Sequence, residues 1–142
     1  MSSVLPPTTT PFGERVARRL HDEVIIWLTT VGADGTPQPN PVWFLWDGTA
    51  ILVYSLTGAV RNRNIQRDPH VGLNFDGNGQ GGDIVIITGQ AHISPNEPPA
   101  DQNPAYVAKY HDRIARSFGT PANFAAQYSV AIRITPSRVH GH

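Results

Sequence analysis

The sequence predicts a mainly β protein: a closed or partly closed antiparallel barrel of six strands with a few peripheral helices. Six short segments have the composition of strands, and short turns separate them. The helical segments are too few to alternate with the strands, as they would in a doubly wound sheet. One strand carries a proline at every second position, which marks a place where the sheet should open.

The chain should begin with a helix followed by a strand. Thr10 and Pro11 have the pattern of an N-cap and a first helical position, and apolar residues then recur every four positions to about Glu23. Residues 24–28 form a continuous apolar run, which is typical of a strand covered on both faces. Residues 33–35 predict a tight turn after this strand.

The next strand carries the alternating prolines Pro37, Pro39 and Pro41. Successive N–H groups of a strand point to opposite edges, so these prolines remove donors from one edge only. We expect the proline edge to face a bend, a ligand or another chain. Three N–H groups remain for pairing on the other edge, those of Gln38, Asn40 and Val42.

Three strands are predicted in the middle of the chain. Residues 51–55 should pair back across a turn at residues 47–48. Residues 71–75 alternate in hydrophobicity, as a strand with one buried face does. Residues 83–94 predict a long strand in which Gly89 marks a bulge or bend.

The C-terminal third predicts two helices and a last strand. A helix should start at Asn103-Pro104 and end at Gly119, and a shorter one should start at Pro121. Residues 130–134 alternate as a strand, which we expect to end before Pro136.

Composition limits the classes of function. The 142 residues suggest one domain, with residues 10–142 folded and residues 1–9 disordered. Only 15% of the residues are charged, so we expect part of the surface to be buried in an oligomer. The formal net charge is zero, which argues against general binding to nucleic acids or anionic membranes. The chain has no cysteine, which excludes disulfides, thiol catalysis and cysteine-based zinc sites.

The sequence predicts a cytoplasmic protein by default. It contains no apolar run of membrane-spanning length, and its first residues lack the pattern of a secretory signal. Ten arginines stand against a single lysine, Lys109, a bias typical of a GC-rich genome.

The strongest functional signal follows the strand at residues 51–55. A short basic helix begins there, with Ser55 and Thr57 at the junction and Arg61, Arg63 and Arg67 beyond it. Hydroxyls, free backbone N–H groups and guanidinium groups together predict a phosphate site. No catalytic nucleophile accompanies them, which favours a phosphorylated cofactor that brings its own chemistry. The alternative is a solvated helix that merely carries arginines.

Other motifs carry less. The glycine-rich segment 77–82 leads into a strand and not a helix, so we interpret it as a hairpin loop, at the rim of a pocket if it is functional. His140 and His142 lack the further ligands that a zinc site needs, so we predict no metal site. Trp43 and Trp46 flank the proline strand and are either core aromatics or the cover of a flat ring.

Four segments in order, residues 28–48, 54–77, 81–93 and 98–110, resemble the flavin/deazaflavin oxidoreductases of the pyridoxamine 5'-phosphate oxidase-like split-barrel superfamily. Within it, they resemble the actinobacterial branch that uses the deazaflavin coenzyme F420. The resemblance covers roughly residues 14–139. It implies a six-stranded split β-barrel of the FMN-binding type, which dimerises and binds its cofactor in grooves at the subunit interface.

The resemblance also implies site residues. Asn40, Pro41, Val42 and Trp43 fall on the strand that backs the isoalloxazine-like ring, and Ser55, Arg61, Arg63 and Asn64 fall on the phosphate-binding stretch. Two positions depart from the family. Arg61 stands where relatives usually have lysine, which changes the geometry offered to a phosphate, and the chain ends in His142 where relatives often have an aromatic residue.

The expected function is therefore that of a homodimeric oxidoreductase. Reduced coenzyme F420 would pass a hydride to an electron-poor double bond, such as an enone or a quinone-like group, with no dedicated catalytic side chain. Two alternatives stay open: an FMN-dependent oxidase or reductase on the same barrel, and a non-catalytic carrier of a flavin or deazaflavin. The acidic tail of F420 would profit from cations at the groove mouth, for which the candidates are Arg67, Lys109, Arg113 and Arg116.

Overall fold

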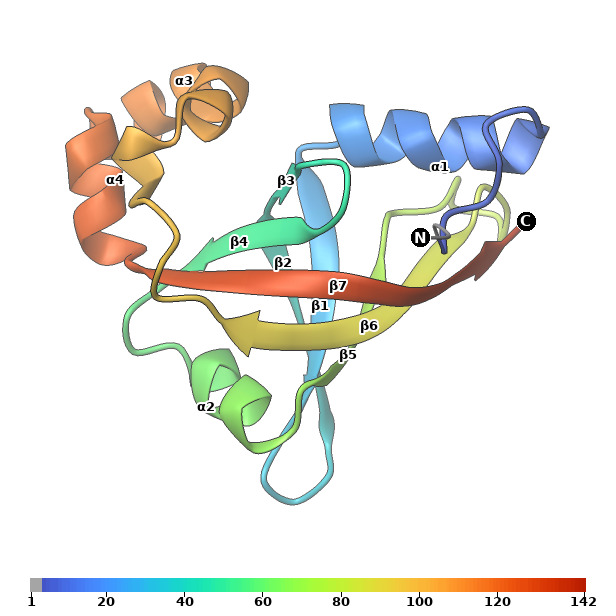
Figure 1. Ribbon diagram of the computed structural model, residues 1–142, viewed down its shortest axis with the longest axis horizontal. Helices are drawn as coiled ribbons and strands as arrows, with labels where there is room; N and C mark the ends of the chain where they lie inside the picture. Colours follow the sequence, from blue (N-terminus) through green and yellow to red (C-terminus); the bar gives the residue numbers. More distant parts are fainter. Residues whose placement is uncertain (1–3) are drawn as a thin grey trace.

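The computed structural model describes residues 4–142, which form one curled antiparallel sheet with helices around it (Figure 1). The strand order is β2-β1-β5-β6-β7-β4-β3. The strands are β1 (Ile25–Val31), β2 (Pro37–Trp43), β3 (Leu45–Trp46), β4 (Ile51–Ser55), β5 (His70–Asn74), β6 (Val85–Ile93) and β7 (Val130–Gly141). The helices are α1 (Pro11–Asp22), α2 (Val60–Arg67), α3 (Pro104–Phe118) and α4 (Pro121–Gln127), with a 3-10 turn at Ala100–Gln102. The mainly β fold class is confirmed, with one strand more than expected, the two-residue β3.

The barrel is split between β2 and β3. These two strands lie at opposite edges of the sheet although only Phe44 separates them along the chain. β2 pairs with β1 alone, and the residue pairs Thr29–Pro39 and Trp27–Pro41 face each other in this ladder. The prolines therefore lie on an edge strand, as the alternation predicted, because a proline cannot donate to a second neighbour.

β6 and β7 form the longest ladder, and a bulge interrupts it. The register shifts between Thr88 and Gly89, so that Gly89 pairs with Pro136 and Thr88 with Arg138. The bulge at Gly89 is confirmed. The predicted end of the last strand before Pro136 was wrong, because β7 continues to Gly141. A proline is tolerated inside a ladder at a bulge, where no partner requires its N–H group.

Two hydrophobic clusters hold the fold together. The inner cluster fills the barrel and includes Ile26, Leu28, Val53 and Ile134 together with Ile65 of α2. The outer cluster lies between β4 and the helices α3 and α4. Its buried members are Leu52, Tyr54, Ala100, Tyr106, Tyr110, Ile114, Phe124 and Ala131. Side chains of β4 alternate between the two clusters, so all five of its residues are buried.

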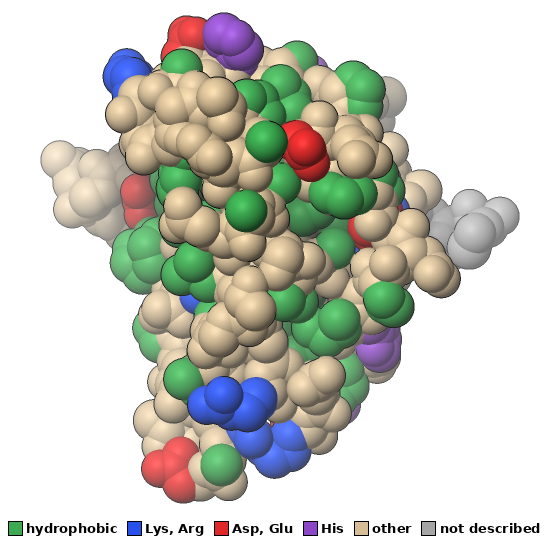
Figure 2. Space-filling model, turned by 90° about the vertical axis from the view of Figure 1, so that its left-hand side faces the viewer, with side chains coloured by type: hydrophobic (Ala, Val, Ile, Leu, Met, Phe, Trp, Pro, Cys, Tyr) green, Lys and Arg blue, Asp and Glu red, His purple; other side chains and the backbone are tan. Residues whose placement is uncertain are grey.

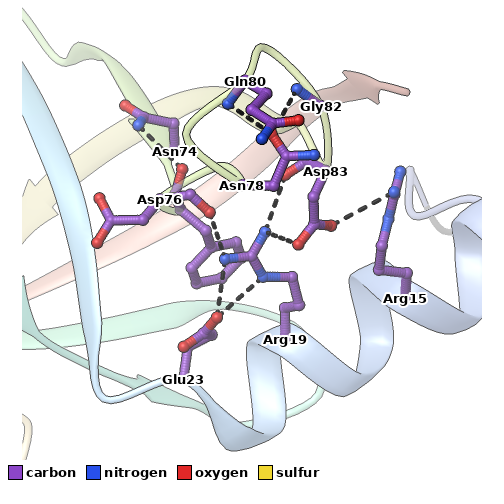
Figure 3. Close-up of polar contacts among 10 residues, drawn as sticks. Arg15, Arg19, Glu23, Asn74, Asp76, Asn78, Gln80, Gly82 and Asp83 are labelled. Atoms are coloured by element: carbon purple, nitrogen blue, oxygen red, sulfur yellow. Dashed lines mark hydrogen bonds and ion pairs between the residues drawn. The ribbon is translucent and has the colours of Figure 1, made fainter.

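Helix α1 is attached to the loop between β5 and β6 by Arg19 (Figure 3). The guanidinium group of Arg19 donates to the backbone oxygens of Asp76 and Asp83, pairs with Glu23 at 2.8 Å, and stacks on Phe75. Arg19 thereby holds both ends of the glycine-rich segment 77–82, which is a hairpin loop as predicted.

The structure describes only part of the N-terminal segment, residues 1–9, that was predicted to be disordered. Residues 1–3 of the segment expected to be disordered lie outside the described residues. Leu5 packs against the inner cluster, and the Pro7 carbonyl accepts from the Thr10 N–H group just before α1. Thr10 caps α1 through its hydroxyl, as the sequence predicts. Across residues 4–142, no helix combines the length and apolarity that crossing a membrane requires.

Asp47 should contribute to the stability of the fold in an acid-sensitive way. Burial alone would raise its pKa, but the N–H groups of Thr49 and Ala50 and the Arg133 guanidinium group together lower it from 3.8 to about 2. The folded pKa lies below the unfolded one, so this contribution is present above about pH 4 and is lost as the pH falls through about 2. We expect urea titrations between pH 5 and 2 to show a loss of no more than about 1 kcal/mol from this group, because the side chain is 34% exposed. Asp47→Asn should flatten that part of the profile; an unchanged profile would contradict the assignment.

Candidate functional site

A pocket of about 440 Å³ lies where the barrel is split. Its walls are the end of β2 at residues 41–43, Leu56 directly after β4, Arg61 in the first turn of α2, and Phe118 and Phe124 from α3 and α4. Figure 2 views the molecule from the side on which Figure 1 places α2, α3 and α4. Hydrophobic side chains are spread over the face, and Lys and Arg side chains gather near its lower end, at the level where Figure 1 places α2. The remaining lining residues are Ile25, Tyr54, Ser117 and Tyr128.

Arg61 is the one charged residue that lines this pocket. Its side chain is half-buried, and desolvation lowers its pKa from the ordinary value. Nε is buried without a hydrogen-bond partner, and among residues 4–142 no carboxylate pairs with the guanidinium group. A desolvated cation without a counter-ion is unfavourable unless a ligand supplies the negative charge. The arrangement therefore fits an anionic ligand with an apolar, flat body.

The start of α2 adds backbone donors to this wall. Ala59 caps the helix without a side-chain hydrogen bond, so among residues 4–142 no side-chain oxygen caps the first N–H groups of α2; the N–H group of Asn62 donates to the Ala59 carbonyl oxygen at 3.1 Å. Thr57, predicted at this junction, does not line the pocket: its hydroxyl lies 2.7 Å from the Ser129 hydroxyl and 3.2 Å from the Gln127 backbone oxygen. These bonds connect the β4–α2 loop to the end of α4 and to the residues that follow it.

Ser55 is completely buried, and its Oγ has no hydrogen-bond partner. Its neighbour Tyr54 packs in the outer cluster and lines the pocket, whereas Val53 packs in the inner cluster. Because side chains alternate along a strand, Ser55 lies on the inner side with Val53. Ser55 therefore does not line the pocket, although its neighbours in the chain, Tyr54 and Leu56, do.

Asn64 holds α2 against the β1–β2 hairpin. Its amide nitrogen donates to the Thr30 hydroxyl at 3.0 Å and to Gln38 Oε1 at 2.8 Å, and its oxygen accepts from Arg67 at 2.9 Å. Arg67 also donates to the Val31 carbonyl. The amide of Asn64 is used within the chain, so we assign it to positioning the helix that carries Arg61.

Replacing Asn64 with alanine should destabilise the fold by about 2 kcal/mol, because Asn64 is 2% exposed and the change leaves buried polar groups unsatisfied. The midpoint of urea unfolding measures this. Gln66→Ala is the matched control, since Gln66 is exposed on the same helix. Equal stability of the two variants would contradict a structural role for Asn64.

Aromatic rings also line this pocket. Trp43 stacks on Tyr110 with ring centroids 4.5 Å apart and on Phe124 at 5.4 Å, and Phe124 stacks in turn on Tyr128 at 4.6 Å. These near-parallel rings run from the outer cluster to the pocket. Trp43 packs against the outer cluster, as its interpretation as a core aromatic predicted, and it also lines the pocket. That it covers a flat ring stays a prediction. Trp46 instead packs against the inner cluster.

Of the residues predicted for the cofactor, the structure brings Pro41, Val42, Trp43 and Arg61 together in the pocket lining. Asn40 is exposed on β2, and Arg63 is exposed on α2; neither lines the pocket. Phe124 and Tyr128 also line the pocket, and neither was predicted as a site residue. The apolar residues of the short helix after Pro121 were the available signal, but only packing shows which cavity they face.

The cations proposed for the groove mouth are divided. Arg67 is bound to Asn64 and Val31, and Lys109 is half-buried against Phe44. Arg113 and Arg116 are exposed on α3 and line a shallow polar hollow of about 450 Å³ beside the pocket-lining end of this helix. No group of three His, Cys, Asp or Glu residues that could hold a metal occurs within the described part of the chain. The loop at residues 77–82 does not line the pocket.

The sheet order and the pocket at the split between its two edge strands are those of a split β-barrel. The family model described as pyridoxamine 5'-phosphate oxidase matches residues 12–142. The chain therefore belongs to the pyridoxamine 5'-phosphate oxidase family.

Solved structures agree with this membership. A structure named F420 reductase is 26% identical, with a TM-score of 0.66 over 87% of this chain and 94% of that one. A putative pyridoxamine 5'-phosphate oxidase from Listeria innocua is 21% identical, with a TM-score of 0.65 over 89% and 94%. HutZ, the heme storage protein from Vibrio cholerae, is 15% identical, with a TM-score of 0.63 over 93% and 95%. The last two show the fold alone. The search of curated proteins found no match.

Proposed function

We propose that this protein is a cytoplasmic oxidoreductase that binds coenzyme F420 in the pocket at the split of its barrel and reduces an electron-poor double bond of a small molecule. The observation that carries the proposal is Arg61, a desolvated guanidinium group without a counter-ion beside an aromatic wall. Membership in the family and the likeness to an F420 reductase support the choice of cofactor.

The lining fits a phosphorylated flavin-type molecule. Arg61 and the start of α2 would hold the phosphate, because Arg61 Nε and the N–H groups of Val60 and Arg61 have no acceptor among residues 4–142. Pro41, Val42 and Trp43 would lie along the ring, which has apolar faces. When bound, reduced F420 supplies a hydride. The chain's own part is to bind, to orient and to exclude water, and this needs no nucleophile.

The decisive experiment titrates the purified protein with F420 and with FMN by fluorescence, then mixes each reduced form with a panel of enones and quinones. The proposal expects tighter binding of F420, weakened by added salt, and turnover of at least one acceptor. Tighter FMN binding with turnover would make the protein an FMN-dependent oxidoreductase. Tight binding without turnover would favour a carrier, and binding of neither cofactor would refute the proposal.

We also propose a homodimer whose interface borders the pocket. Leu56 is 40% exposed and Val60 51% exposed beside it, and the proline edge of β2 has no strand neighbour among residues 4–142. Apolar side chains and a free sheet edge next to one another suit a second copy of the chain. Light scattering at micromolar concentration should give about twice the chain mass of 15.5 kDa. A monomer that binds the cofactor with full affinity would contradict this.

A further inference from the structure

Phe44 is the single residue that carries the chain from one edge of the sheet to the other. Such a crossing leaves its backbone N–H and C=O groups outside the strand ladders. Both are satisfied by side chains of α3. The Phe44 N–H group donates to the Tyr110 hydroxyl at 2.8 Å, and the Phe44 oxygen accepts from Lys109 Nζ at 2.8 Å. The residues that these bonds join are 66 and 65 positions apart in sequence, so only the tertiary fold brings them together.

Tyr110 extends this set of bonds to the start of β1. Its hydroxyl lies 2.7 Å from the Val24 carbonyl and 3.0 Å from the Phe44 carbonyl. Because Lys109 already serves the Phe44 oxygen, the Tyr110 hydroxyl is free to donate to Val24 while it accepts from Phe44. Tyr110 is completely buried, so water cannot replace either bond.

Lys109 also contacts the side chain of Phe44. Nζ lies 3.8 Å from the centroid of the Phe44 ring, within the range of a cation–π contact. Burial lowers the pKa of Lys109 to about 8, although Asp22 and Glu23 act in the opposite direction. The one lysine of the chain thus places its ammonium group at the crossing, while its side chain stays half-buried.

The residue before the crossing is Trp43, which lines the pocket. Its ring stacks on Tyr110 with an interplanar angle of 5°. The same α3 residue therefore contacts the pocket wall through its ring and the crossing through its hydroxyl.

We propose that α3 is a clamp that sets the pocket wall, with Tyr110 and Lys109 as positioning residues that act through Phe44 on Trp43. The proposal rests on the proposed function, in which a planar cofactor lies along this wall. Neither residue needs to touch the cofactor: Lys109 and Tyr110 do not line the pocket. The clamp fixes the distance between the aromatic wall and Arg61, and so the affinity for a ligand that must contact both.

The test compares Tyr110→Phe and Lys109→Met with Lys109→Arg, which keeps a charged donor. Each is titrated with F420 and with FMN, and the near-UV circular dichroism of the free protein reports the Trp43–Tyr110 stack. We expect about tenfold weaker binding for Tyr110→Phe and Lys109→Met, with a reduced near-UV signal, because buried polar partners are lost. Lys109→Arg should stay within about threefold of the original protein.

Two controls separate positioning from general loss of stability. Val16→Ala lowers stability through α1 and the inner cluster, away from this wall, and should leave both affinity and the near-UV signal unchanged. His111→Ala changes an exposed residue on α3 and should behave as the original protein does. If Val16→Ala weakens binding as much as Tyr110→Phe does, the clamp is overturned. If the original protein binds neither cofactor, the proposed function fails, while an unchanged near-UV signal in Tyr110→Phe would overturn the clamp by itself.

Discussion

Replacing Arg61 with alanine is expected to weaken binding of F420 or FMN by about 10- to 100-fold, because a charge-assisted contact contributes about 1.5–3 kcal/mol. The unfolding free energy of the cofactor-free protein should stay the same or rise. Arg61 is partly desolvated there without a counter-ion, so its removal relieves a penalty. Fluorescence titration and urea unfolding of the same preparations measure both quantities.

Arg63→Ala is the matched control for this experiment. It removes the same charge from the same helix, but Arg63 is exposed and does not line the pocket. We expect the affinity to change less than about threefold, because water and salt screen an exposed charge. Arg61→Lys should bind with intermediate affinity, as an ammonium keeps the charge and loses the planar fork. Equal losses of cofactor affinity for Arg61→Ala and Arg63→Ala would contradict binding in the pocket and would favour general attraction by a basic helix.

Replacing Gly89 with alanine is expected to destabilise the fold by about 3 kcal/mol. A Cβ atom at this position would lie 2.4 Å from the Thr135 oxygen and 3.2 Å from the Pro136 Cα, which are both backbone atoms of the facing strand. Backbone cannot move aside as a flexible side chain does, so β6 and β7 would have to separate at the bulge. The midpoint of urea unfolding should fall accordingly.

Gly72→Ala tests whether the effect belongs to the bulge or to any strand glycine. Gly72 lies on the adjacent strand β5, and nothing lies within 4 Å of the position of its added Cβ. We expect a change of less than about 1 kcal/mol, in the stabilising direction, because alanine restricts the unfolded chain. If both variants lose the same stability, the close approach at Gly89 does not decide the strength of the ladder.

Most of the secondary structure was readable from local patterns. The strand predicted at residues 51–55 has these bounds in the structure, and the helices after Thr10, Asn103 and Thr120 begin where their capping residues predicted. The misreadings have a common cause. Local rules end a strand at Pro136, and β3 is too short to leave a pattern in the sequence. The continuation of β7 beyond Pro136 and the strand β3 both form because a facing strand pairs with them. Pairing partners far away in sequence are not visible in a local window.

The candidate site divides in the same way. The chemistry of Arg61 at a strand–helix junction was visible in the sequence, because charge, hydroxyls and a helix start are local features. That Arg63 would face solvent, and that Asn64 would bond to Thr30 and Gln38, was not. Helical positions two apart, as Arg61 and Arg63 are, point to nearly opposite sides of a helix, and which one meets the pocket depends on how the helix is rotated against the sheet.

The sequence by itself determined the mainly β class, the open proline edge and the basic helix that points to a phosphate, because these follow from periodicity, missing donors and charge. Only the tertiary structure decided which residues form the site. It set Trp43 against Phe124, left Arg61 without a counter-ion among residues 4–142 and placed Lys109 on Phe44. Burial and pairing between segments distant in sequence decide these contacts, and no local pattern encodes them.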